Sequence, residues 1–245
     1  MNPLVQTTRR QSSVHDLLTA RSPIWTVFRD MAGVLRFQDS ASEVRLREHL
    51  ALCDMSCFAR MSVKGPLAVQ RMTECGIPVP QKSYEHRQSE DGGLVVRVDS
   101  QEIFLEDGPD SRLVDLVRSR LDPTMPGVYG IDRQEAAFWL TGNEATQVLA
   151  QTCGIDFREH TPLWVFSRAA GVSCGLLPWR VDRTPVFRIW TDASYGAYLW
   201  EELLKIVNEL GGDAVGLGCF YPELSANPIA DDPWTPLRQT FHRPD

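Results

Sequence analysis

The stretch PVFRIWTDASYGAYLWEELLKIVNELGG, residues 185–212, is the most informative about the fold, because a strand pattern is followed directly by a helix pattern. Val186, Phe187, Ile189 and Trp190 are residues that favour extended backbone. After them, apolar side chains recur at steps of three or four, which is the period of an amphipathic helix: Tyr195, Leu199, Leu203, Ile206 and Leu210. The glycine pair 211–212 ends the predicted helix.

The rest of the chain shows the same alternation of predicted strands and helices. We expect strands at 56–63, 93–98, 102–106, 135–140, 163–168 and 172–177. We expect helices at 42–54 with Ser42 as cap, at 64–80, from Pro109 onward, and at 142–154 with Asn143 as cap. This order predicts an α+β fold of two similar halves, in which antiparallel sheets are covered by helices.

Composition shifts suggest four segments. Residues 1–22 are polar and rich in Ser, Thr and Arg, and we expect an N-terminal arm with a short amphipathic piece at VHDLL. The helix-breaking stretch LDPTMPG, 121–127, suggests a boundary between a first half, 23–122, and a second half, 123–221. Residues 222–245 show no apolar period and are predicted to form a C-terminal tail.

The charge balance narrows the classes of partner. A formal net charge of −7 over 245 residues argues against nucleic acid or an anionic membrane as the main partner. No apolar run approaches the roughly 20 residues that span a bilayer. Because no apolar segment follows the two N-terminal arginines, we also expect no secretory signal. The expected location is therefore the cytoplasm.

Six cysteines are scattered through the chain, and in a reducing cytoplasm they are expected to be buried thiols. Cys53 and Cys57 would share a helix face with His49, which is one arrangement that can hold a metal. No fourth ligand is evident, so the sequence favours core packing and no metal site. The five histidines are isolated, which is more typical of structural or solvated side chains than of catalysis.

The only dense cluster of functional side chain types lies in PWRVDRTPVFR, residues 178–188. Trp179, Arg180, Asp182 and Arg188 are the candidates for lining a groove there. They suit either an anionic ligand, a partner's acidic residues, or a solvated edge. Glu90, Asp91 and Asp99 fall in polar turns, so the residues alone indicate no catalytic group and favour a binding or subunit role.

The ordered motifs resemble a family. EVRLREHLALCDMSCFARMSVKGPLAVQRM (43–72), the hairpin and helix of 92–117, the segment 136–156 and the stretch 186–218 resemble the aminomethyltransferases of the glycine cleavage system. Closer still is the gamma subunit of heterotetrameric sarcosine oxidase and of related N-methyl amino acid oxidases. The likeness covers roughly residues 14–220 and implies the folate-binding domains of that superfamily without its C-terminal barrel.

The departures from the family bear on catalysis. In the aminomethyltransferases, aspartates follow the glycine pair of the hairpin, and one of them serves the chemistry on folate. Val96 and Arg97 stand at the matching positions here. The family's glutamate-bearing second loop is shortened to PWRVDRTP, where Asp182 is the remaining acid. A valine cannot accept a proton, and an arginine repels a cationic iminium.

The resemblance therefore implies a non-catalytic gamma-type subunit of a flavin-dependent oxidase or dehydrogenase acting on an N-methylated amine or amino acid such as sarcosine. Large and small flavoprotein subunits would be its partners and would carry FAD, FMN and NAD. Tetrahydrofolate stays open as a ligand of this chain. The alternative is a stand-alone tetrahydrofolate-dependent methyl- or aminomethyltransferase using Asp99 or Asp182. A role in iron–sulfur cluster maintenance is disfavoured, because the signature cysteine motif is absent around Cys174.

Overall fold

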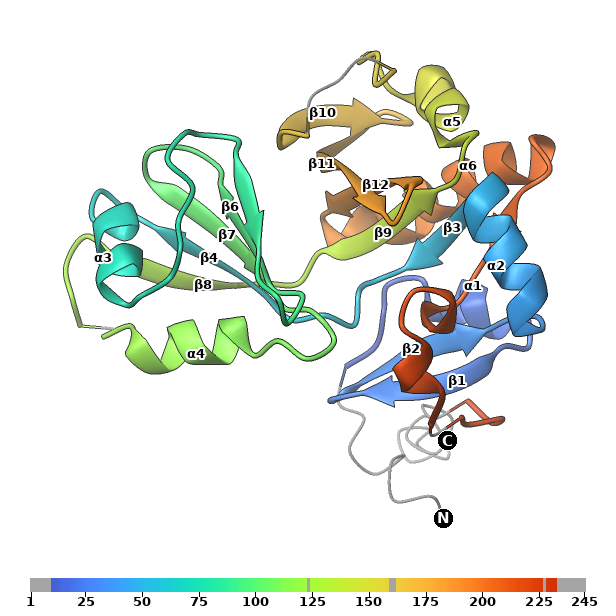
Figure 1. The fold of residues 1–245 in the computed structure, drawn as a ribbon, viewed down its shortest axis with the longest axis horizontal. Coiled ribbons are helices and arrows are strands. Elements are labelled where there is room, and N and C mark those ends of the chain that lie inside the picture. The colour runs from blue at the N-terminus through green and yellow to red at the C-terminus, as the bar shows by residue number, and fades with distance from the viewer. Residues whose placement is uncertain (1–9, 123, 159–161, 227, 233–245) are drawn as a thin grey trace, which may run out of the picture.

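The computed structural model describes residues 10–122, 124–158, 162–226 and 228–232, and these form three open sheets (Figure 1). The five-stranded sheet has the order β5 (His86–Gln88), β6 (Leu94–Arg97), β7 (Glu102–Glu106), β4 (Arg60–Lys64) and β8 (Tyr129–Arg133). The six-stranded sheet has the order β10 (Val165–Ala169), β11 (Val172–Val181), β12 (Thr184–Thr191), β9 (Ala136–Thr141), β3 (Ala51–Asp54) and β13 (Asp213–Ala214). A hairpin of β1 (Ile24–Phe28) and β2 (Met31–Arg36) completes the set.

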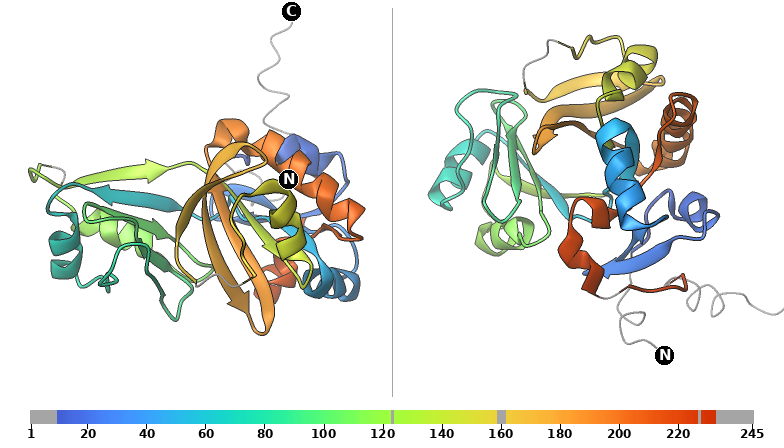
Figure 2. Two further views of the ribbon diagram at one scale, coloured as in Figure 1. Left: turned by 90° about the horizontal axis from the view of Figure 1, so that it is seen from above. Right: turned by 45° about the vertical axis from the view of Figure 1, so that its right-hand side comes forward.

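Helices cover one face of each large sheet, and Figures 1 and 2 show the two lobes that result. Against the five-stranded sheet pack α3 (Ala68–Glu74) and α4 (Leu113–Arg120). Against the six-stranded sheet pack α5 (Ala145–Thr152) and α6 (Gly196–Glu209), with α1 (His15–Thr19) beside them. The remaining helical pieces are α2 (Ser40–His49), η2 (Ala193–Tyr195), η3 (Leu217–Cys219) and η4 (Pro222–Ala226). No helix of the described residues is long and apolar enough to cross a membrane.

The predicted fold class is confirmed: the molecule is α+β, and every ladder is antiparallel except the short pairing of β13 with β3. Within residues 185–212, the expected strand and helix are present as β12 and α6, joined by the short helix η2. Leu199, Leu203 and Val207 of α6 are fully buried, and Gly211 adopts a left-handed φ of 80° just past its end.

One predicted helix is wrong in its second half. The helix expected over 42–54 ends at His49, and Ala51–Asp54 continues as β3 between β9 and β13. All four residues of β3 are buried, because both faces of this central strand are covered. The cap is also one turn earlier than expected: the Asp39 carboxylate accepts a hydrogen bond from the Ser42 backbone N–H at 3.0 Å.

Three further boundaries differ from expectation. The helix predicted from Pro109 begins at Leu113, where the Asp107 carboxylate accepts from the Val114 N–H at 2.9 Å. The α5 helix has Glu144 at its N-cap without a side chain hydrogen bond, so Asn143 is not its cap. The stretch 178–185, expected as a loop, is hairpin instead: β11 runs to Val181 and β12 starts at Thr184.

Each large sheet takes strands from both sides of the expected boundary at 122–123. The β3 strand comes from the first half and lies within the six-stranded sheet, whereas β8 comes after that boundary and pairs with β4. The division into folding units stays a prediction. In the expected arm, Val14 and Leu18 are fully buried, and in the expected tail Ile229 pairs with Trp25 through two backbone hydrogen bonds.

The interior between the two large sheets is a hydrophobic cluster of its own. It is distinct from the two clusters beneath the helices and is rich in aromatic side chains. It includes Phe58, Phe104, Trp139, Trp164, Trp179, Trp190, Phe220 and Tyr221. This shared interior joins residues of both large sheets to residues of the β1–β2 hairpin and of η3, and it holds the candidate site.

Candidate functional site

A buried carboxylate joins the two large sheets. Glu106, the last residue of β7, is 1% exposed and lies directly across the ladder from Arg60 of β4. Its Oε2 accepts from Arg60 Nε at 2.7 Å and from the indole N–H of Trp190 at 2.6 Å. Its Oε1 accepts from Arg188 Nη2. Because Arg188 and Trp190 belong to β12, these bonds tie the five-stranded sheet to the six-stranded sheet.

The electrostatics of this network keep Glu106 charged. Burial alone would raise the pKa of Glu106, but the guanidinium groups of Arg188 and Arg60 and the Trp190 N–H favour the carboxylate more strongly. The pKa of Glu106 therefore lies below its ordinary value. A carboxylate held ionised by three donors is a poor proton acceptor, so this arrangement suits a structural link better than acid–base chemistry.

The Arg188 side chain is enclosed by indole rings. Its Cζ lies 5.1 Å from the ring centroid of Trp139, 5.4 Å from Trp190 and 5.9 Å from Trp179. Arg188 is 3% exposed, and its Nε and Nη1 find no hydrogen-bond partner among the described residues. Attraction between the cation and the ring faces offsets part of the cost of burying that edge. The three indole rings therefore hold the Arg188 guanidinium in place beside Glu106.

The positions that the resemblance assigns to the family's aspartates face different surroundings. Val96 is fully buried in the cluster between the sheets, opposite His86 in the β5–β6 ladder. Arg97 points to the other side, where its Nη1 donates to the carbonyl of Gln81 at 2.6 Å. Neither residue offers a carboxylate, and the Glu106 oxygens nearby are already bonded. The side chains present at this place therefore do not fit the chemistry that the family performs on folate.

The four groove candidates do not form one site. Trp179 and Arg180 line a groove of about 480 Å³ together with His86, Thr146, Phe157, Arg158, Pro162, Pro178, Pro185 and Phe187. Arg188 lies inside the molecule in the Glu106 network instead. Asp182 sits at the tip of the β11–β12 hairpin with its side chain 81% exposed, 4.0 Å from Arg47. Successive side chains of a strand point to opposite faces of the sheet. Arg180 and Arg188 therefore face different surroundings, although they come from neighbouring strands.

The groove itself has aromatic walls and two exposed arginines. His86 packs edge-on against Trp179 with ring centroids 4.8 Å apart. Burial, and then the charge of Arg188, lower the pKa of His86, so its neutral form is favoured. Arg158 is bonded to Asp156, and Arg180 donates to the carbonyl of Arg183 at 3.0 Å.

The other candidates behave as turn or core residues. Asp99 accepts from the Gln101 N–H at 2.6 Å, and Asp91 accepts from the Gly93 N–H at 3.2 Å, while Glu90 is exposed. All six cysteines are buried thiols, as expected. The proposed helix face of His49, Cys53 and Cys57 does not exist, because Cys53 lies in β3. Within the described residues, no group of three potential metal ligands comes together.

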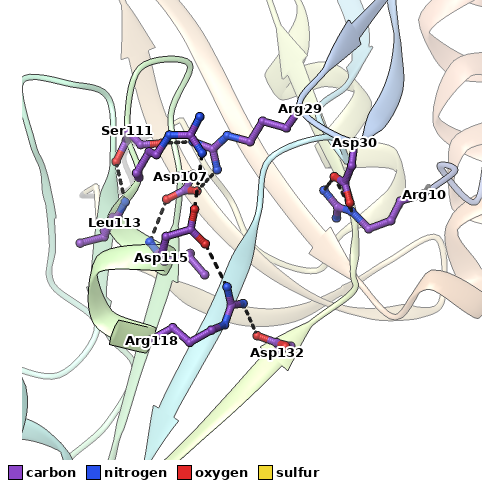
Figure 3. Close-up of polar contacts among 11 residues, drawn as sticks. Arg10, Arg29, Asp30, Asp107, Ser111, Leu113, Asp115, Arg118 and Asp132 are labelled. Carbon is purple, nitrogen blue, oxygen red and sulfur yellow. Dashed lines mark hydrogen bonds and ion pairs between the residues drawn. The ribbon is translucent and has the colours of Figure 1, made fainter. Parts of the chain in front are cut away.

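A second ionic junction lies outside the shared interior, and Figure 3 shows it. Arg29, in the turn of the β1–β2 hairpin, has a left-handed φ of 56° and bonds both the Asp107 carboxylate and the carbonyl of Ser111. Since Asp107 also accepts from the Val114 N–H in the first turn of α4, this arginine fastens the hairpin to the five-stranded lobe. In the same view, Arg118 bridges Asp115 and Asp132, at 2.9 and 2.7 Å.

Sequence reasoning missed Glu106 and Arg60, which are the centre of the interior network. Both occur in stretches read as strands, EIFLE and SCFARMSV, where a charged residue among buried neighbours is the available signal. Only the register of the β4–β7 ladder, which the structure provides, shows that the two charged residues face each other.

With this geometry established, comparison with known proteins defines the class of fold. No family model matches the chain, and no curated protein matches it either. Among solved structures, the glycine cleavage system aminomethyltransferase T from Bartonella henselae matches with a TM-score of 0.67 and 17% identity. That match covers 86% of this chain and 60% of the aminomethyltransferase chain, so this chain spans less than two thirds of that protein. The fold is therefore that of the aminomethyltransferases.

A second solved structure agrees with the resemblance drawn from the sequence. Heterotetrameric sarcosine oxidase from Corynebacterium sp. U-96, in complex with pyrrole 2-carboxylate, matches with a TM-score of 0.60 and 16% identity. The match covers 83% of this chain and 97% of the sarcosine oxidase chain. This chain is thus similar in fold to nearly the whole of one chain of that assembly.

Proposed function

We propose that this chain is a non-catalytic, gamma-type subunit of a flavin-dependent heteromeric oxidase or dehydrogenase of an N-methylated amine or amino acid such as sarcosine. The observation that carries the proposal is the interior between the two large sheets. Aromatic side chains and the Glu106–Arg60–Arg188 network fill the interior in which Val96 lies, and Val96 stands at one of the positions that the resemblance assigns to folate chemistry. A scaffold whose interior is committed to packing serves best by assembly.

The extent of the structural matches supports the same proposal. The match covers nearly all of a sarcosine oxidase chain but leaves two fifths of the aminomethyltransferase unmatched. We propose that large and small flavoprotein subunits supply FAD, FMN and NAD, and that the complex works in the cytoplasm. Tetrahydrofolate would bind elsewhere in the assembly.

Co-expression tests the proposal. The chain is expressed together with candidate large and small flavoprotein subunits from the same organism, purified through a tag on this chain, and sized by mass photometry. We expect one stable complex that contains flavin and oxidises an N-methylated amino acid. A chain that stays monomeric in the presence of both flavoproteins would contradict the proposal.

The stand-alone transferase is the competing function, and its relocated acids can be assessed. Asp99 is engaged in its own turn, and Asp182 is largely solvated at a hairpin tip. Neither is shielded from water in the way that favours a general acid or base near neutral pH. We therefore expect Asp99→Asn and Asp182→Asn to leave the activity of the purified complex unchanged. A loss of more than about tenfold in kcat, roughly 1.4 kcal/mol of barrier, would favour the transferase.

A further inference from the structure

The strand β10 forms one edge of the six-stranded sheet. Its strand neighbour among the described residues is β11, and a two-residue turn joins the pair at Ala169 and Val172. In such a hairpin, every second residue of β10 bonds its backbone N–H and C=O groups to β11. Phe166 and Arg168 are the residues in between, so their N–H and C=O groups point outward. A bridge between Cys153 and Ala169 closes one end of this edge, and the Trp164 N–H, which donates to the Tyr84 carbonyl at 2.8 Å, closes the other. The outward backbone groups of Phe166 and Arg168 lie between these two contacts. An open edge of this kind is a template for another strand.

An aromatic side chain is held in position on this edge. Phe166 is 61% exposed, and its ring packs edge-on against Trp164 with centroids 5.7 Å apart. Trp164 stacks on Trp190 at 4.7 Å, and Trp190 donates to Glu106. The exposed ring is therefore the outer end of a row that is fixed to the buried network. A rigid aromatic anchor loses little conformational entropy on binding, which is typical of interface hot spots.

Gly175 makes this arrangement of rings possible. It lies opposite Phe166 in the β10–β11 ladder and opposite Trp190 in the β11–β12 ladder. A Cβ at this position would lie 2.3 Å from the Trp164 ring. The bare backbone of Gly175 is thus the floor on which Trp164 rests beside the exposed Phe166.

The same face also carries a positive charge, that of Arg168. Arg168 lies two residues from Phe166, on the same side of the strand and opposite the exposed Ser173. No ion pair of Arg168 occurs within the described residues. Between the two side chains lies an open groove of about 680 Å³, bounded also by Gly154, Ser167, Ser173 and Cys174.

One of the two edges of the other large sheet, the β8 edge, differs in its charges. On β8, Tyr129 is 59% exposed, comparable to Phe166. However, Asp132 is bonded to Arg118 at 2.7 Å, and Lys64 of the adjacent strand is bonded to Glu102 at 2.9 Å. The charged side chains of the β8 edge are therefore paired within the chain, whereas Arg168 on the β10 edge has no ion pair among the described residues and lies beside an aromatic ring.

We propose that the large flavoprotein subunit docks on β10 by adding an extended strand to its open edge. The docking strand carries an apolar side chain against Phe166 and, two positions along, a carboxylate that pairs with Arg168. This spacing follows from the alternation of side chains in paired strands. The inference rests on the proposed function, because it names the surface through which that assembly forms.

The test uses the co-expressed complex and three variants of the full chain. Phe166→Ser removes the anchor, Arg168→Glu reverses the charge, and Tyr129→Ser is the matched control on β8. We expect the first two each to weaken binding of the large subunit by about tenfold or more, as at interface hot spots, and the control to bind as the unchanged chain does. Hydrogen exchange should slow at the Phe166 and Arg168 amides on assembly.

The outcomes separate the inference from the function on which it rests. Equal assembly of Phe166→Ser, Arg168→Glu and the unchanged chain would overturn the docking surface while leaving the proposed function standing. Weakening by Tyr129→Ser alone would move the interface to β8 and overturn it as well. Failure of the unchanged chain to assemble would contradict the proposed function itself. Because Arg168 is an exposed side chain, Arg168→Glu is expected to fold and keeps the test decisive if Phe166→Ser does not.

Discussion

Single residues decide how the two sheets are held together, and Glu106 is the most demanding of them. In Glu106→Gln, two buried guanidinium groups lose their shared carboxylate. Removing one partner of a buried ion pair costs about 3–5 kcal/mol, because the remaining charge stays buried without compensation. We expect a loss of that size in the free energy of unfolding, measured in urea. Asp182→Asn, at an exposed tip, serves as the control, and a loss below about 1 kcal/mol in Glu106→Gln would contradict the network's role.

The pH dependence of that loss has a defined sign. The folded-state pKa of Glu106 lies below its ordinary value of 4.5, so its stabilising effect is fully present above that value. It is lost as pH falls through the lower, folded-state pKa, where the native carboxylate becomes protonated. The difference in unfolding free energy between the unchanged chain and Glu106→Gln should therefore shrink below about pH 4.5. A difference that grows on acidification would show that the carboxylate is not held ionised.

Gly175 tests the packing of the aromatic row. A methyl group at Gly175 would collide with the Trp164 ring, and overpacking of this kind costs about 1–3 kcal/mol. We expect Gly175→Ala to lower the thermal midpoint and to change tryptophan fluorescence. Gly154→Ala is the matched control, because no heavy atom lies within 4 Å of a Cβ there. If the two variants unfold alike, Trp164 does not rest on Gly175.

At the scale of elements, the sequence predicted α6 and β12 well because both carry a complete local period. It failed at residues 50–54, where apolar residues continue the helical spacing of α2 but the chain turns into β3. A buried strand in the middle of a sheet and a buried helix segment share the same apolar run, so periodicity cannot separate them. The strands β1, β2, β5, β8 and β13 were not predicted, because short strands depend on pairing with distant neighbours.

Two substitutions distinguish the predicted helix from the observed strand. In a continuous helix over 42–54, Val44 and Leu52 would both contribute to the apolar surface. In the structure, Val44 is 37% exposed whereas Leu52 is fully buried in β3. We expect Leu52→Ala to cost about 2–5 kcal/mol in denaturant unfolding and Val44→Ala to stay within about 0.5 kcal/mol. Similar losses of unfolding free energy in both variants would instead support a continuous helix over residues 42–54.

At the scale of the whole molecule, the fold class followed from the order of elements, but the candidate site did not. Trp179, Arg180, Asp182 and Arg188 are neighbours in sequence, yet the hairpin sends Arg188 inward and leaves Asp182 at the tip. Two of the partners of Arg188, Glu106 and Trp139, come from β7 and β9, about 80 and 50 residues earlier in the chain. Local spacing contains no record of such long-range contacts, which the pairing of β12 with β9 and the packing of the two sheets create.

We propose that the interior between the sheets serves packing rather than folate chemistry. Calorimetric titration of the isolated chain with tetrahydrofolate tests this proposal. We expect no saturable binding at micromolar concentrations, because indole rings and the Glu106 ion pairs already fill this interior. Saturable micromolar binding that is lost in Val96→Trp, a variant that crowds the same interior, would contradict it.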